Sequence, residues 1–87
     1  MKTKYSPLEQ YLKHLPQSTR EANLTFAEVE RIIEGALPKS AHEFREWWAN
    51  ESGDTRHVQS KSWRRAGFYV DQVQQRSSGG SVRFCRR

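Results

Sequence analysis

The sequence predicts an α+β domain in which four short helices precede a C-terminal β-hairpin, an order typical of winged helix-turn-helix modules. Up to about residue 66, apolar residues recur at helical spacing behind capping sequences. Residues 68–86 instead predict two strands around a turn rich in Gly and Ser. Because 87 residues suffice for one domain, we expect a single compact unit over 5–87, helical over about 6–66 and a hairpin over about 68–86.

The first helix is predicted to begin at Ser6. Residues 6–9 (Ser-Pro-Leu-Glu) combine a capping Ser, a Pro at the first helical position and a Glu three residues after the cap, which is a capping box. The apolar residues that follow share one helical face: Leu8, Tyr11, Leu12 and Leu15. Pro16 ends this helix, and the polar segment 16–23 is expected to be a loop.

The second helix has the clearest signal, and we expect it over about 26–34. Thr25 and Glu28 form its capping box. Its buried stripe comprises Val29, Ile32, Ile33 and Ala36. Gly35 is expected as the residue that ends the helix, and Pro38 prevents any continuation.

A third capping box, residues 40–43 (Ser-Ala-His-Glu), predicts a further helix that Asn50 closes. Its apolar residues lie at helical spacing: Phe44, Trp47 and Trp48. We expect Trp47 to belong mainly to the core, although Trp48 at the core's edge could stack on a base.

The fourth helix is predicted over about 57–66, with Gly67 ending it, and most of its residues are polar. After it the pattern changes to that of strands. Residues 68–73 are β-branched and aromatic, and residues 81–85 alternate with period two. Between them, 76–80 (Arg-Ser-Ser-Gly-Gly) predict the turn of a hairpin.

Charge is distributed unevenly along the chain, whose net charge is +5. Residues 1–55 carry seven Lys/Arg against nine Asp/Glu, whereas residues 56–87 carry eight against Asp71 alone. Seven of these eight later cations are Arg, whose planar guanidinium suits phosphates and base edges. The C-terminal third is therefore predicted to present a basic surface to an anionic partner.

In the winged helix-turn-helix interpretation, the fourth helix enters the major groove of duplex DNA and the hairpin lies along the backbone. Gln and Arg side chains can pair with adenine and guanine edges, and the other cations reach phosphates. The predicted nucleic-acid-binding residues are Arg56, Gln59, Ser60, Lys61, Arg64, Arg65, Arg76, Arg83 and Arg86, with Arg87 beside them. The alternative is a fourth helix that is merely a solvated surface, but such faces usually mix charges of both signs.

Several other classes of function find no support in the sequence. His14, His42 and His57 lack the spacing of metal ligands, and the single cysteine, Cys85, excludes both an internal disulfide and a Cys-rich zinc site. No nucleophile–base pair or phosphate-binding Gly loop is evident, so we expect no enzyme, no cofactor and no metal. Without a long apolar run or a signal sequence, the chain is expected to be cytoplasmic and away from membranes.

Five motifs together resemble a family of small uncharacterised bacterial domains that carry the same order of motifs. The resemblance spans about Tyr5 to Arg86 and implies one compact domain, but it transfers no site residues. The motifs are Leu24-Thr25-Phe26-x-Glu28-Val29-Glu30-x-Ile32-Ile33, Leu37-Pro38-x-Ser40-Ala41, Trp47-Trp48-x-Asn50, Trp63-x-x-Ala66-Gly67-Phe68-x-Val70 and the strand Val82 to Arg86.

Two functions follow from these observations. The first is nucleic-acid binding, most simply to duplex DNA, as a small regulator of bacterial or phage origin. The second is a protein-interaction module, an inhibitor or adaptor that docks its basic face on an acidic protein, because Arg and aromatic residues are also preferred anchors of protein interfaces. Recognition of palindromic DNA would require a homodimer, and the sequence leaves the choice between monomer and dimer open.

Overall fold

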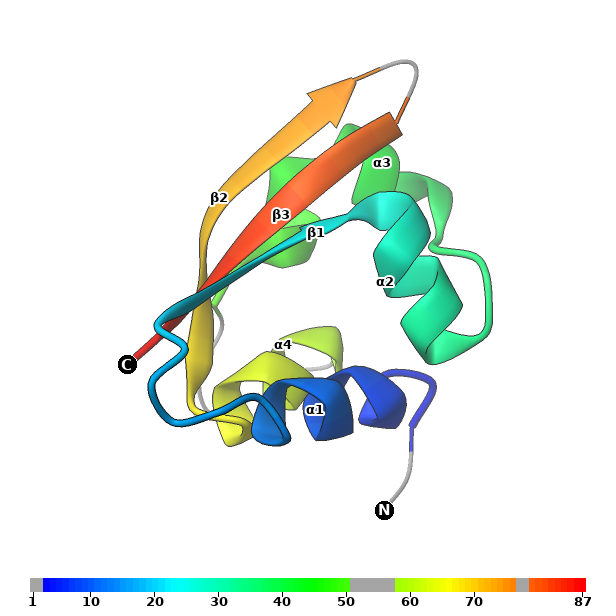
Figure 1. Ribbon diagram of the computed structural model, residues 1–87. Coiled ribbons are helices and arrows are strands. Elements are labelled where there is room, and N and C mark those ends of the chain that lie inside the picture. The colour runs from blue at the N-terminus through cyan, green and yellow to red at the C-terminus, as the bar shows by residue number, and fades with distance from the viewer. Residues whose placement is uncertain (1–2, 51–57, 77–78) are drawn as a thin grey trace.

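The computed structural model describes residues 3–50, 58–76 and 79–87, and within these ranges it contains four α-helices, one 3₁₀-helix and three strands (Figure 1). In chain order they are α1 (Ser6–Lys13), β1 (Glu21–Thr25), α2 (Phe26–Ile33), α3 (Lys39–Glu43), the 3₁₀-helix η1 (Arg45–Trp48), α4 (Val58–Arg65), β2 (Phe68–Arg76) and β3 (Gly79–Arg86). The predicted α+β class is confirmed, with the hairpin at the C-terminal end of the chain.

The three strands form one antiparallel sheet in the order β1-β3-β2, so the last strand of the chain lies in the middle. The prediction of a loop over 16–23 is wrong for its second half, because β1 pairs with β3 from Glu21↔Cys85 to Thr25↔Ser81. Local patterning could not show this strand. Only Ala22 and Leu24 on β1 are apolar, and the partner strand lies 60 residues further along the chain.

A β-bulge at Asp71 decides which side chains of β2 face the core. Val70 pairs with Phe84, but the next register pair is Gln72 with Arg83, so Asp71 is an extra residue on the β2 side. Because an inserted residue moves every later side chain to the other face, Val70 before the bulge and Val73 after it both pack toward the core. Asp71 and Gln72 remain exposed.

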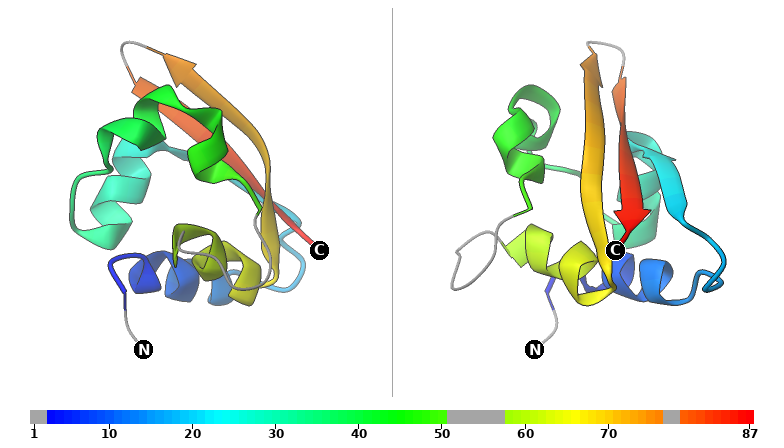
Figure 2. Two further views of the ribbon diagram at one scale, coloured as in Figure 1. Left: turned by 180° about the vertical axis from the view of Figure 1, so that it is seen from behind. Right: turned by 90° about the vertical axis from the view of Figure 1, so that its left-hand side faces the viewer.

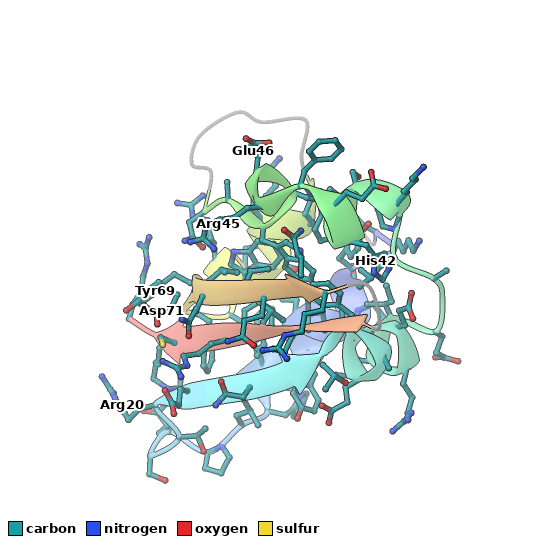
Figure 3. All side chains as sticks on the ribbon, turned by 90° about the horizontal axis from the view of Figure 1, so that it is seen from above. Arg20, His42, Arg45, Glu46, Tyr69 and Asp71 are labelled. Atoms are coloured by element: carbon teal, nitrogen blue, oxygen red, sulfur yellow. The ribbon has the colours of Figure 1, made fainter. Side chains whose placement is uncertain are left out.

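All the helices lie on the concave side of the curved sheet, as Figure 1 and Figure 2 show, and Figure 3 looks onto the other face, which is open. The core between the layers is rich in aromatic side chains, each of which removes a large apolar area from water. Its largest fully buried members are Trp48, Trp63, Phe68, Phe84, Leu8 and Leu12. The open face of the sheet is left to polar side chains such as Asn23, Gln72 and Gln74, which are exposed.

Of the three predicted capping boxes, only the second is confirmed. The Thr25 N–H donates to Glu28 Oε1 at 2.9 Å, and the Glu28 N–H donates to Thr25 Oγ1 at 3.0 Å. The first helix does begin at Ser6, but Tyr5 is its N-cap residue and makes no side-chain capping bond. The Ser6 hydroxyl accepts a hydrogen bond from the Thr3 N–H instead. At the end of α2, Glu34 and not Gly35 adopts the left-handed conformation, with φ of 55°.

The third predicted helix is broken in two at Phe44, whose backbone is extended (φ −119°, ψ 121°), and Pro38 precedes its first segment in place of a capping Ser. The break lets Trp48 enter the core and donate its indole N–H to the carbonyl of Ala41 at 2.9 Å. Its consequence is that Phe44, expected on the buried stripe, is 54% exposed. Burial of the larger indole accounts for this outcome.

Asn50 connects the segment after η1 to both α4 and β2. Its Oδ1 accepts hydrogen bonds from Trp63 Nε1 at 3.0 Å and from the Val70 N–H at 2.7 Å, and its Nδ2 donates to the Val70 carbonyl at 2.8 Å. One side chain therefore satisfies two backbone groups on the outer edge of β2 and orients the central Trp of α4. These bonds fix the position of α4 against the edge of the sheet.

A candidate nucleic-acid interface

The structure corrects the prediction for the first part of α4. Gln59 and Ser60, expected to face a DNA groove, are 5% and 0% exposed. The Gln59 amide Nε2 donates to the main-chain carbonyl of Trp47 at 3.1 Å. With Ser62 and Trp63 these residues form the buried arc of a helix that packs against α1 and β2, so they cannot read base edges.

The opposite arc of α4 carries its cations. Arg65 is exposed, and Lys61 and Arg64 are partly exposed. Arg64 and Arg65 lie in the last turn, where the partial negative charge of the helix terminus favours cations. That local stabilisation is one reason for their presence. Arg65 is exposed to solvent at the end of the helix, whereas the Nε atom of Arg64 is buried.

Arg86 has a structural role in addition to its charge. Its Nε donates to the carbonyl of Thr19 at 2.9 Å, its Nη2 donates to the carbonyl of Pro16 at 3.0 Å, and its guanidinium carbon lies 4.6 Å from the centre of the Phe68 ring. These contacts fasten the α1–β1 loop to the end of β3. Arg86 is thus an organiser of this region rather than a side chain that extends freely into solvent.

Backbone hydrogen bonds then gather cations from three separate segments. The Arg86 N–H donates to the carbonyl of Arg20 at 2.7 Å, and the Arg87 N–H donates to the carbonyl of Gly67 at 2.9 Å, just after α4. We call this region the basic end and define it by Arg20, Arg64, Arg65, Arg86 and Arg87. The right-hand view of Figure 2 shows the backbone at this end of the molecule, with the C-terminus near the ends of α4 and of the α1–β1 loop.

Arg20 is the member of the basic end that sequence analysis missed. It lies in the N-terminal part of the chain, where charges of both signs nearly balance. It joins the later cations only because β1 pairs with β3. Figure 3 shows Arg20 at the same end of the sheet as Tyr69 and Asp71 of β2. No local signal in the sequence marks this proximity.

Arg83 lies at the centre of the open sheet face and is partly neutralised there. Its Nε is 3.2 Å from Asn23 Oδ1 and 3.8 Å from Glu21 Oε2, and its Nη1 is 3.6 Å from Asp71 Oδ2. The two carboxylates reduce the positive potential that Arg83 was expected to offer to phosphates. The bulge at Asp71 places one of these carboxylates beside β3.

The remaining predicted residues lie elsewhere or outside the described ranges. Arg76 is exposed at the far end of β2, so the length of the hairpin separates it from the basic end, about 23 Å for seven residue steps of a strand. Its Nη2 donates to Gln74 Oε1 at 3.3 Å. Arg56 lies outside the described residues. Of the predicted set, the structure therefore brings Arg64, Arg65 and Arg86 together.

Cys85 lies on the open sheet face next to this region, opposite Tyr69 in the register of β2 and β3. Partial burial raises the pKa of its thiol, and the nearby carboxylates of Asp71 and Glu21 raise it further. A raised pKa keeps the thiol protonated near neutral pH and lowers its nucleophilicity. This environment is that of an inert cysteine, and it gives no support for thiol chemistry at the interface.

The described part of the chain offers no group of three or more His, Cys, Asp or Glu side chains that could hold a metal ion. Within the same residues, no helix has the length and apolar character needed to cross a bilayer. Neither a curated protein nor a solved structure matches this chain. A family model does match it, over residues 5–87, and its description is "Domain of unknown function (DUF7662)". The chain belongs to this family of small uncharacterised domains.

Proposed function

We propose that the protein binds the phosphate backbone of nucleic acid, most simply of duplex DNA, through the basic end. The observation that carries this proposal is that backbone hydrogen bonds join three segments distant in sequence, each of which carries an exposed cation: Arg20, Arg65 and Arg87. Arg side chains form charge-assisted, bidentate hydrogen bonds with phosphate oxygens, and each neutralised phosphate releases counterions. Arg86 holds the α1–β1 loop against the end of β3, and the Arg87 N–H joins the C-terminus to Gly67 after α4, so the segments are in place before any ligand arrives.

The proposed contacts are mainly to phosphates and only secondarily to bases. Gln59 and Ser60 are buried, which removes the two neutral side chains expected to read base edges. The cations that remain on α4 are Lys61, Arg64 and Arg65. Contacts from cations to phosphates set the position of a protein on a duplex without specifying sequence. We therefore expect weak discrimination between DNA sequences.

A winged arrangement is the finer form of the proposal. In it α4 and the β2–β3 hairpin approach the same duplex as helix and wing. Its support is the short connection of α4 to β2 through Ala66 and Gly67, with φ of 85° at Gly67, which keeps the helix and the hairpin next to one another. The burial of Gln59 and Ser60 limits the part of α4 that could enter a groove to its last turns.

A titration of fluorescently labelled duplex at several salt concentrations tests the proposal. With four to five phosphates neutralised, the logarithm of the association constant should fall with that of salt concentration with a slope of about −4. Sequence changes in the duplex should alter affinity far less than salt does. If no duplex or single strand of DNA or RNA binds at low salt, nucleic acid is not the partner.

A protein-interaction module remains the second candidate, and one observation favours it. Phe44 projects from the break between α3 and η1 and is 54% exposed, whereas most large apolar side chains are buried. Exposed aromatic side chains often anchor protein interfaces. Recovery of one stoichiometric acidic protein with the wild-type chain after nuclease treatment, reduced by Phe44→Ser or by charge reversal at the basic end, would favour this candidate over nucleic acid.

A further inference from the structure

A hollow of about 420 Å³ lies at the hairpin end of the sheet, away from the basic end. Its floor and walls include Thr25, Gln74, Arg76, Gly79, Gly80 and Ser81. Three of these residues form one row across the sheet, because Ser81 of β3 pairs with Thr25 of β1 on one side and with Gln74 of β2 on the other. The hollow therefore spans all three strands.

Two glycines begin the strand at the centre of this hollow, and one of them leaves bare backbone facing it. Gly79 and Gly80 begin β3, opposite Arg76 and Gln75 of β2. A Cβ atom on Gly79 would meet no atom within 4 Å, and φ of 133° at this position favours glycine, so the strand offers bare backbone to the hollow there. Gly80 serves the other face of the sheet, where a Cβ atom would lie 2.5 Å from Cε2 of the buried Phe26 ring.

The groups around the hollow suit an oxyanion. Arg76 contributes a guanidinium, Ser81 a hydroxyl and Gln74 an amide, and Arg76 Nη2 already lies 3.3 Å from Gln74 Oε1. Among the described residues that line the hollow, none is Asp or Glu. Glu28, in the first turn of α2, has its carboxylate engaged by the Thr25 N–H at 2.9 Å. A tetrahedral phosphate matches a forked cationic donor beside a hydroxyl donor.

We propose that this hollow is a second phosphate site, which takes a backbone phosphate of the nucleic acid whose main contact is the basic end. This inference rests on the proposed function, because the nucleic acid bound at the basic end supplies the phosphate. The hairpin begins directly after α4 and carries Arg76 to its far end, about 23 Å from the basic end by the rise of a strand. A duplex that follows the hairpin meets cations at both ends, with the partly neutralised Arg83 between them.

Two measurements on the full chain test this site. In the first, ¹⁵N–¹H spectra are recorded while inorganic phosphate replaces chloride at constant ionic strength. The amide signals of Gly80 and Ser81 should shift and saturate, and Arg76→Gln should abolish the shifts. In the second, Arg76→Gln should lower affinity for a labelled duplex about threefold to tenfold and reduce the salt slope by about one. The matched control is Arg31→Gln, which removes another exposed charge, from the last turn of α2, and should change affinity less than twofold.

The outcomes separate this inference from the proposed function. Duplex binding that depends on Arg65 and Arg87 but not on Arg76, without phosphate shifts at Gly80 and Ser81, overturns the second site and leaves the basic end in place. If phosphate shifts the amide signals of Gly80 and Ser81 in a chain that binds no duplex, the bound phosphate does not belong to nucleic acid. That result overturns both this assignment and the proposed function. Loss of duplex affinity in Arg76→Gln with Arg31→Gln unaffected, and a native spectrum for both variants, supports the site.

Discussion

The main-chain N–H of Arg86 donates a hydrogen bond to the carbonyl of Arg20 at 2.7 Å, which joins the last strand to the loop before the first. The side chain of the same Arg86 bonds to the carbonyls of Pro16 and Thr19 in that loop. One residue thus uses its backbone and its guanidinium to fix the position of Arg20. The cationic surface depends on this connection as much as on the charges themselves.

Replacement of Arg86 by Ala should therefore mainly lower stability, whereas replacement of Arg87 by Ala should mainly weaken duplex binding. Arg86→Ala removes two hydrogen bonds and the stack on Phe68, and we expect it to lower the free energy of unfolding by about 2–3 kcal/mol. Arg87→Ala, at an exposed position, should change it by less than about 0.5 kcal/mol but weaken duplex binding. Urea unfolding and duplex titration measure the two effects. Equal stability of the two variants would contradict the structural role of Arg86.

The case of Arg86 shows how far the sequence alone could lead. Helix α2 and both strands of the hairpin were predictable, because capping by Thr25 and Glu28 and the alternation in β3 are local signals. β1 was not, since a five-residue strand with two inward side chains is stabilised by its partner and not by its own pattern. The position of Arg20 and the fastening role of Arg86 depend on that pairing.

The burial of Gln59 and Ser60 escaped prediction for a related reason. On a short helix with few apolar residues, polar side chains can fill the core side when backbone groups satisfy them, as the Trp47 carbonyl satisfies Gln59. Composition therefore did not reveal which face of α4 is buried. The charge of its last turn was predictable, because Arg64 and Arg65 are adjacent in the sequence and follow the buried Trp63.

Asn50 should contribute more to stability than its exposed position suggests. Asn50→Ala leaves Trp63 Nε1 and both backbone groups of Val70 without their partner, and we expect a loss of about 2–4 kcal/mol in the free energy of unfolding. The control is Asn23→Ala on the open sheet face, where the amide oxygen accepts one bond from Arg83 at 3.2 Å, and there the loss should be under about 1 kcal/mol. Urea unfolding followed by Trp fluorescence measures both. Similar losses in the two variants would show that Asn50 does not hold α4 and β2 together.

Glu28 should make stability depend on pH in the acidic range. The hydrogen bond from the Thr25 N–H, with the Thr25 side chain second, holds the pKa of the Glu28 carboxyl below its usual value of 4.5. The unfolded chain therefore takes up this proton at a higher pH than the folded chain does. The contribution is fully present above the unfolded pKa and is lost as pH falls through the lower folded pKa.

The measurement is the difference in unfolding free energy between wild type and Glu28→Gln, taken at several values from about pH 6 down to about pH 3. We expect the advantage of the wild type to shrink toward the acidic end, because Gln carries no titrating group. A difference that stays constant over this range would show that the capping carboxylate does not contribute as an ion.

The carboxylates of Glu21 and Asp71, on the open sheet face, should weaken the binding of duplex DNA. Both carboxylates lie within 4 Å of the Arg83 guanidinium, so the double variant Glu21→Gln with Asp71→Asn uncovers one cation and removes two negative charges beside the basic end. We expect duplex affinity to rise about threefold to tenfold at low salt, with a smaller gain at high salt. Duplex titration measures this gain.

The control for that variant is Glu43→Gln with Glu46→Gln, which makes the same change in net charge on α3 and η1. It should raise affinity much less. An equal gain in the two double variants would mean that overall charge governs binding and that the position of Arg83 is irrelevant.

The most direct test of the central claim is charge reversal at the basic end, with Arg65→Glu and Arg87→Glu combined in one chain. Both side chains are exposed and come from different segments, so the fold should persist, as circular dichroism and urea unfolding would verify. The matched control reverses two exposed cations on α2 and α3, Arg31→Glu with Lys39→Glu. We predict that low-salt duplex affinity falls more than about 100-fold in the first variant and less than about fivefold in the second. Equal losses in the two folded variants, or no loss in the first, would contradict the assignment of nucleic-acid binding to this end of the molecule.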